Sequence, residues 1–269
     1  MPLGRLRSMI PSAIQKATVE TPVRTIHCRR EREIDVLSWI GQGGDCLTGA
    51  FEVARRNPVT GLLACAVGFV VVLMLAYWGD PFPRWDEDLL LGVRASPGTL
   101  ANDLAFAVER LVSPLAQVGW TVLATLLAFR LHRPRRALFA VAEVAGTAVF
   151  VQLLKIALEH PRFRPGPGDP FFWHPVAKAF PSGNSAGALA IALAFLCVVP
   201  RSWRPLTATI GAALTLAVSA GLLVLDYHYP SDVLGGWLVA LGWCFALVVI
   251  QRRRGFAATA SAAGQRRTV

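Results

Sequence analysis

The chain has few charged residues for its length, which excludes an ordinary soluble domain. Of its 269 residues, 16% are Asp, Glu, Lys or Arg and 54% are hydrophobic. Soluble domains have about 25% charged residues and roughly 45–50% apolar residues. A chain this apolar has to place much of its surface in a non-aqueous environment.

Cysteine is sparse as well, and its five positions form no pattern. No two cysteines have the CxxC spacing of a zinc or redox site; they are Cys28, Cys46, Cys65, Cys197 and Cys244. Neither a disulfide framework nor a metal site is indicated. We see no metal-ligand cluster among the other residues, and we expect no cofactor.

Long apolar runs are what the chain has in abundance. Six of them approach the roughly 20 residues that cross a hydrocarbon core as a helix, although the fourth is short and would need residues before its start: Val59–Trp78, Pro114–Leu131, Ala137–Leu158, Ser185–Val199, Leu206–Leu225 and Val233–Ile250. We predict an all-α polytopic membrane protein with six transmembrane helices in residues 58–250. Basic cytoplasmic tails, residues 1–57 and 251–269, flank this domain.

The net charge of +10 is distributed in a way that indicates membrane orientation. Arginines cluster before the first run and after the second, fourth and sixth runs: Arg55, Arg56, Arg130, Arg133, Arg135, Arg136, Arg201, Arg204 and Arg252–Arg254. Under the positive-inside rule these clusters and both termini are cytoplasmic. The basic charge attracts membrane lipids, and we predict no nucleic-acid partner.

The loop between the first two runs is acidic and therefore falls outside. Its carboxylates are Asp80, Asp86, Glu87, Asp88, Asp103 and Glu109. The apolar spacing within Leu100–Leu111 favours a helix at the outer interface, although an ordinary surface loop fits nearly as well.

Three polar clusters lie at run ends that this topology places on the outer face. The first contains Lys155, Arg162 and Arg164. Lysine occurs only three times in the chain, and arginine has planar donors suited to phosphate oxygens. These cations predict an anion site, whereas a lone Lys155 would read equally well as a side chain reaching for the interface.

The second cluster, Ser182-Gly183-Asn184, stands at the start of a predicted helix. A hydroxyl, open backbone N–H groups and the positive end of the helix dipole can bind phosphate. The alternative is an ordinary serine N-cap.

The third cluster is His228 and Asp232, four residues apart at another helix start. The carboxylate can hold one imidazole nitrogen and leave the other as base or nucleophile. A histidine beside an unrelated capping aspartate is the alternative.

In order and spacing, these clusters resemble the signature motifs of the type 2 phosphatidic acid phosphatase superfamily, membrane lipid phosphatases related to vanadium haloperoxidases. The family pattern is Lys-x6-Arg-Pro, Pro-Ser-Gly-His and Ser-Arg-x5-His-x3-Asp. The resemblance implies that His228 attacks phosphorus and forms a phosphohistidine, with Asp232 orienting it. It also implies that Lys155, Arg162, Ser182 and Gly183 hold the phosphoryl oxygens.

The chain departs from the pattern at three places. Asn184 replaces the family's proton-donating histidine, Gly221-Leu222 replaces Ser-Arg, and Phe163 replaces the proline of the first motif. Asparagine cannot act as an acid at neutral pH. We count Asn184 and Arg164 as further phosphate contacts.

Three explanations of these departures stay open. The preferred one is a polyprenyl or other lipid diphosphate substrate, whose leaving phosphate needs no acid. Alternatively His160, His174 or Asp226 supplies the proton and Arg164 replaces the missing arginine. In the third, the protein binds phosphate lipids without hydrolysing them.

We therefore predict a metal-independent lipid phosphate or diphosphate hydrolase. It would lie in the cell inner (plasma) membrane, with its site on the periplasmic or extracytoplasmic side. A lipid phosphotransferase is an open alternative, because a phosphohistidine can pass its phosphoryl group to another acceptor. A transporter fits less well, because its polar groups would lie nearer mid-span.

Overall fold

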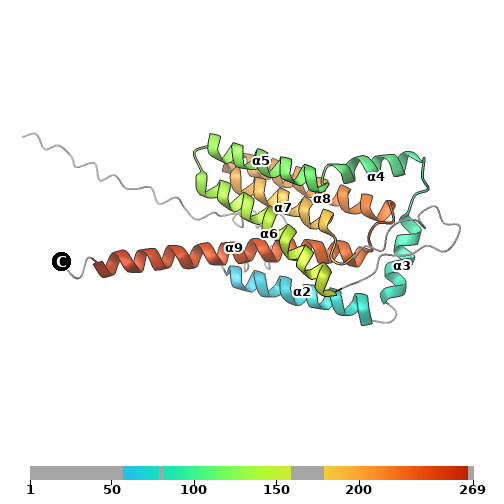
Figure 1. The fold of residues 1–269 in the computed structure, drawn as a ribbon, viewed down its shortest axis with the longest axis horizontal. Coiled ribbons are helices and arrows are strands. Elements are labelled where there is room, and N and C mark those ends of the chain that lie inside the picture. Colours follow the sequence, from blue (N-terminus) through green and yellow to red (C-terminus); the bar gives the residue numbers. More distant parts are fainter. Residues whose placement is uncertain (1–56, 79–81, 159–178, 266–269) are drawn as a thin grey trace, which may run out of the picture. The chain divides into compact units, whose positions relative to one another are not determined.

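The structure, a computed structural model, describes residues 57–78, 82–158 and 179–265, and these residues form helices joined by short turns without a strand (Figure 1). In chain order the helices are α2 (Pro58–Trp78), α3 (Phe82–Val93), α4 (Leu100–Arg110), α5 (Pro114–Arg130), α6 (Pro134–Leu158), α7 (Gly183–Val198), the 3₁₀ helix η1 (Arg201–Trp203), α8 (Arg204–Val224) and α9 (Pro230–Gln265). The all-α class is confirmed. The tail at residues 1–57, apart from Asn57, lies outside the described residues, and α9 continues past the expected end of the last run at Ile250.

Each of the six apolar runs is a helix, and proline marks several of the starts. Pro58, Pro114, Pro134 and Pro230 are the first residues of α2, α5, α6 and α9. Proline suits this position because the first backbone N–H groups of a helix have no partner within it. The starts of these helices are therefore encoded locally.

The expectation of six spans is met only in part. By length and composition, the described residues hold four candidate spans: Pro58–Tyr77, Pro134–Leu158, Arg201–Val224 and Pro230–Arg253. A fifth arises if α4 and α5, bent by 50° at their junction, form one span. Helix α7 has 16 residues, so it covers about 24 Å, less than a hydrocarbon core of about 30 Å.

Helix α7 lies at the centre of the bundle, in contact with α5, α6, α8 and α9. Most of its side chains are buried, and many are small. At its C-terminal end, Arg133 and Arg136 donate hydrogen bonds to the carbonyl oxygens of Val198 (3.1 Å) and Cys197 (3.0 Å). These arginines satisfy carbonyls that a helix leaves unpaired and complement its dipole.

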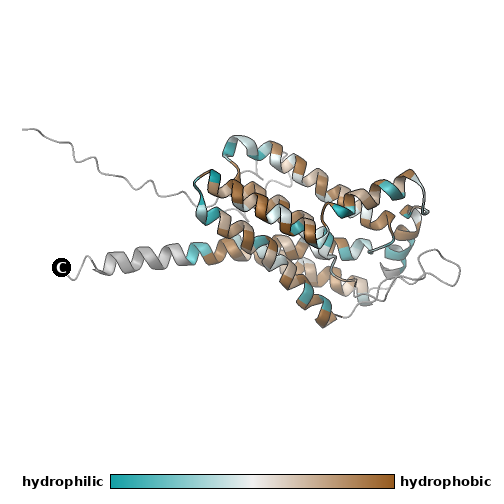
Figure 2. Ribbon diagram, turned by 45° about the horizontal axis from the view of Figure 1, so that its top comes forward, coloured by the Kyte–Doolittle hydropathy of each residue, from teal (hydrophilic) through white to brown (hydrophobic). Residues whose placement is uncertain are grey.

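Helix α2 shows that the bundle turns apolar side chains outward. It packs against α9, where Cys65 and Phe245 are buried together, yet Leu63 and Val67 are about 60% exposed. Figure 2 shows hydrophobic residues along the lengths of the helices and hydrophilic ones gathered toward helix ends and turns. An apolar exterior of this kind suits a lipid environment.

The acidic loop forms helices α3 and α4, so the helical interpretation of this segment is confirmed. Thr99 caps α4, accepting a hydrogen bond from the backbone N–H of Asn102. Helix α4 packs on α8, and α3 contacts both α8 and α9. Both helices are at the end of the bundle where α7 and α9 begin, on the right in Figure 1.

Candidate active site at the starts of α7 and α9

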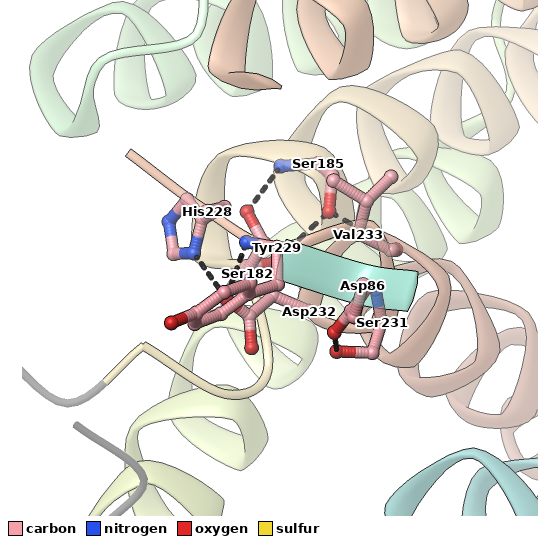
Figure 3. Close-up of polar contacts among 8 residues, drawn as sticks. All are labelled: Asp86, Ser182, Ser185, His228, Tyr229, Ser231, Asp232 and Val233. Atoms are coloured by element: carbon pink, nitrogen blue, oxygen red, sulfur yellow. Dashed lines mark hydrogen bonds and ion pairs between the residues drawn. The ribbon is translucent and has the colours of Figure 1, made fainter. Parts of the chain in front are cut away.

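The contact expected between His228 and Asp232 is present. The chain leaves α8 through a tight turn and enters α9 at Pro230, so Asp232 lies in the first helical turn. His228 Nδ1 is 3.2 Å from Asp232 Oδ2, and the backbone N–H of Tyr229 donates to the same oxygen at 2.9 Å (Figure 3). His228 is 5% exposed and Asp232 is completely buried. The carboxylate therefore holds the imidazole in one orientation.

The serine–glycine cluster is joined directly to the turn that carries His228. Ser182 is the N-cap of α7, its hydroxyl oxygen accepting from the backbone N–H of Ser185 at 3.4 Å. Its own backbone N–H donates to the carbonyl oxygen of Asp232 at 2.9 Å. Ser182 is thus also the helix N-cap that the sequence analysis gave as the alternative. The cap uses its hydroxyl oxygen as an acceptor, so the hydroxyl proton can still be donated to a phosphate.

Close packing of α9 against the start of α7 depends on Gly236. A Cβ atom there would lie 2.5 Å from the carbonyl oxygen of Ser182 and would collide with Ser185 Oγ. Ser185 Oγ donates to the carbonyl oxygen of Val233 at 3.3 Å. Only a residue without a side chain allows the two helix starts to come this close.

Lys155 is on α6, at the same end of the bundle. Val151, one helical turn earlier, is near Gly183: a Cβ on that glycine would lie 3.7 Å from Val151 Cγ1. Lys155 is half-buried. Arg162 and Arg164, the other predicted cations, lie outside the described residues, as do His160 and His174.

Asn184 contacts a residue that no sequence motif singles out. Its Nδ2 donates a hydrogen bond to Glu109 Oε1 at 2.8 Å. Glu109 is in the last turn of α4, and in the sequence it is simply one of the carboxylates of the acidic loop. The two residues are far apart in the chain, and no local pattern could have paired them.

Hydrogen bonds and an ion pair connect α3 and the residue after it to the segment between α8 and the first turn of α9. Asp86 is buried and accepts hydrogen bonds from the backbone N–H (3.0 Å) and the hydroxyl of Ser231 (Figure 3). Arg94 Nη1 is 3.8 Å from Asp226 Oδ2. Asp226, one of the suggested proton donors, thus faces an arginine.

The position of the family's motif-3 arginine is apolar in this chain. Leu222 is fully buried beside Val112, Ala188 and Val218. The neighbouring Gly221 lies against α4, where its Cβ would be 3.3 Å from the carbonyl oxygen of Ala105. Arg94 is a cation that the structure places beside the same turn.

Carboxylates make this end of the bundle partly negative. Burial raises the pKa of the Tyr229 hydroxyl, and the nearby charges of Glu87, Asp232, Asp86 and Asp226 raise it further. A bound phosphate would therefore depend on cations such as Lys155 for charge compensation.

The comparisons with known proteins agree with the family that the sequence motifs indicate. The family model of the PAP2 superfamily matches residues 136–256, which include most of α6, all of α7 and α8, and most of α9. No curated protein matches the sequence.

A solved structure shares the fold: the first transmembrane PAP2 type phosphatidylglycerolphosphate phosphatase from Bacillus subtilis. The match has a TM-score of 0.61 and 18% sequence identity, and it covers 72% of this chain and 96% of that one. At this identity the likeness establishes the fold. The family match over residues 136–256 and the shared fold agree with the motifs, so this multi-pass membrane protein resembles the PAP2 superfamily.

Proposed function

We propose that the protein is a membrane lipid phosphatase that hydrolyses a lipid phosphate, and preferentially a polyprenyl or other lipid diphosphate, on the extracytoplasmic side. The observation that carries the proposal is the buried His228–Asp232 pair joined by a backbone hydrogen bond to the N-cap of α7. A nucleophile, its orienting carboxylate and a helix start that suits an anion thus occupy one small region.

In the proposed reaction, Asp232 accepts the Nδ1 proton of His228 in a hydrogen bond, so Nε2 is the nitrogen that attacks phosphorus. The positive charge that develops on the ring is stabilised by the buried carboxylate. The backbone N–H groups at the start of α7 and the ammonium of Lys155 stabilise the phosphoryl oxygens. Arg162 and Arg164 stay proposed contacts of the same kind.

The preference for a diphosphate rests on Asn184. A lipid alcohol leaves poorly without a proton, and an amide side chain has none to give. The phosphate monoester released from a diphosphate is a much weaker base and departs with little help. Asn184 Nδ2 is also engaged by Glu109, which supports a positioning role for the amide.

Hydrolysis assays on purified protein test this function. Phosphatidate and a prenyl diphosphate are supplied in detergent, and released phosphate is measured for wild type, His228→Ala and His132→Asn. His132 is exposed in the turn between α5 and α6, and the next residue, Arg133, contacts the C-terminal end of α7 rather than its start, so its variant controls for the loss of a histidine. We expect release from the diphosphate that is abolished only by His228→Ala.

Two results would contradict the proposal. Equal background release by wild type and His228→Ala would rule out the hydrolase and leave a phosphate-lipid-binding protein. Release from phosphatidate but not from the diphosphate would refute the leaving-group preference. In addition, Asn184→His should raise the phosphatidate rate by up to about 10²–10⁴-fold, the typical contribution of a general acid.

A further inference from the structure

We infer that Glu109 is the general base that activates the water for the second half of the reaction, the hydrolysis of the phosphohistidine. The inference rests on the proposed function, because it assumes that His228 becomes phosphorylated. It adds a catalytic carboxylate from α4, outside residues 136–256 that match the family model.

The position of Glu109 is fixed by the packing of α4. Val108 and Val112, on either side of it in sequence, pack in one apolar cluster with Ala188 of α7 and Leu222 of α8. The hydrogen bond from Asn184 Nδ2 to Glu109 Oε1, 2.8 Å long, then orients the carboxylate. Asn184 directly follows Gly183 at the helix start, so the carboxylate lies beside the proposed phosphate site.

The carboxylate retains the capacity to accept a proton. Oε1 accepts from Asn184, whereas Oε2 has no hydrogen-bond partner within the described residues. The Glu109 side chain is half-buried, so water can reach it. An ionised carboxylate is a suitable general base for water.

The carboxylates around the start of α9 have other partners. Asp232 is bound to His228, Asp86 to Ser231 and Asp226 lies against Arg94. Asn184 itself cannot take up a proton. Among the described residues near the start of α7, Glu109 is therefore the carboxylate best placed to take a proton from water.

The proposed reaction has two steps, formation of the phosphohistidine and its hydrolysis. In the first, His228 Nε2 forms a bond to the terminal phosphorus, and the P–O bond to the lipid monophosphate breaks, with its electron pair leaving on that oxygen. In the second, a water oxygen attacks phosphorus, and the P–N bond breaks with its electron pair returning to His228. The water proton passes to Glu109 Oε2 and then to solvent, so the products are lipid monophosphate and inorganic phosphate.

The test separates formation of the phosphohistidine from its hydrolysis. Purified full-length protein is mixed with a prenyl diphosphate carrying a radioactive terminal phosphate and quenched at successive times. We expect Glu109→Gln to form labelled protein in a burst approaching one label per chain and to turn over about 10²–10⁴-fold more slowly than wild type. Asp103→Asn, an exposed position on the same helix, should behave as wild type.

The labelling and phosphate-release results distinguish failure of the proposed function from failure of the inference about Glu109. If neither wild type nor Glu109→Gln is labelled and neither releases phosphate from the diphosphate or from phosphatidate, the proposed function is wrong. If wild type turns over and Glu109→Gln matches it, the inference about Glu109 is wrong and the function stands. If thermal unfolding shows that Glu109→Gln is folded but the variant forms no labelled phosphohistidine, Glu109 acts before the water step. That result also overturns the inference.

A second variant tests whether the role is chemical. The double variant Glu109→Gln with Asn184→His offers a histidine in place of the missing base. We expect it to lose the labelled intermediate at least tenfold faster than Glu109→Gln alone. No rescue, with the fold intact, would count against a base at this position.

Discussion

Among single side chains, Asp86 connects α3 to the start of α9 and thereby fixes the turn that carries His228. Its carboxylate accepts hydrogen bonds from the backbone N–H and the hydroxyl of Ser231, and both residues are buried. A carboxylate at this place also meets the positive end of the α9 dipole. The contact thus contributes to stability and to the geometry of the site.

Replacing Asp86 should be costly for these reasons. Asp86→Ala leaves two buried donors of Ser231 unsatisfied, which destabilises the protein by about 1–3 kcal/mol. We expect a lower unfolding temperature in detergent and reduced hydrolysis, because the His228 turn loses its support. Asp88→Ala, at an exposed position of α3, should change neither. An Asp86→Ala protein as stable and as active as wild type would show that the contact is dispensable.

At the scale of elements, the site depends on how closely α9 approaches α7. The hydrogen bond from Ser182 to Asp232 and the missing side chain of Gly236 belong to the same junction. At its other end α7 is held by Arg133 and Arg136. A helix too short to span the bilayer alone is thus fixed at both ends by its neighbours.

The junction predicts the effect of adding one methyl group. Gly236→Ala places a carbon 2.5 Å from the carbonyl oxygen of Ser182, so the helices must separate. Overpacking of this kind costs about 1–3 kcal/mol, and activity should fall along with thermal stability. Gly119→Ala is the matched control, since a Cβ there meets no atom within 4 Å. Similar losses in both variants would argue against the junction as the cause.

At the scale of the whole molecule, the arginine clusters and the candidate site lie at opposite ends of the described bundle. Arg133 and Arg136 are at the C-terminal end of α7, and the His228 turn is at its N-terminal end. The positive-inside rule predicts that the arginines are cytoplasmic, so we expect the site to open outside. Its substrate headgroup would then lie in the outer leaflet.

Cysteine labelling in cells checks this orientation. In a chain whose five cysteines are replaced by alanine, Asp88→Cys on α3 and Arg130→Cys on α5 present exposed thiols at the two ends. We expect a membrane-impermeant maleimide to label Asp88→Cys in intact cells and Arg130→Cys only after permeabilisation. The reverse pattern would place the site in the cytoplasm.

The sequence by itself determined what depends on neighbouring residues. Apolar runs marked six of the helices, and the spacing of four residues between His228 and Asp232 predicted their contact, because both are set by local backbone geometry. Ser182 was expected at a helix start for the same reason. The order and spacing of the motifs were enough to indicate the family.

Tertiary structure alone decided which distant groups meet these residues. Glu109 beside Asn184 and Asp86 beside Ser231 depend on α3 and α4 folding over the ends of α8 and α9. No motif in the acidic loop indicates that Glu109 and Asp86 make these contacts, because their partners come close only when the helices pack. Likewise, the number of spans depends on the shortness of α7 and on the bend between α4 and α5. The short fourth run indicated the first in the sequence, whereas the bend is visible only in the packed structure.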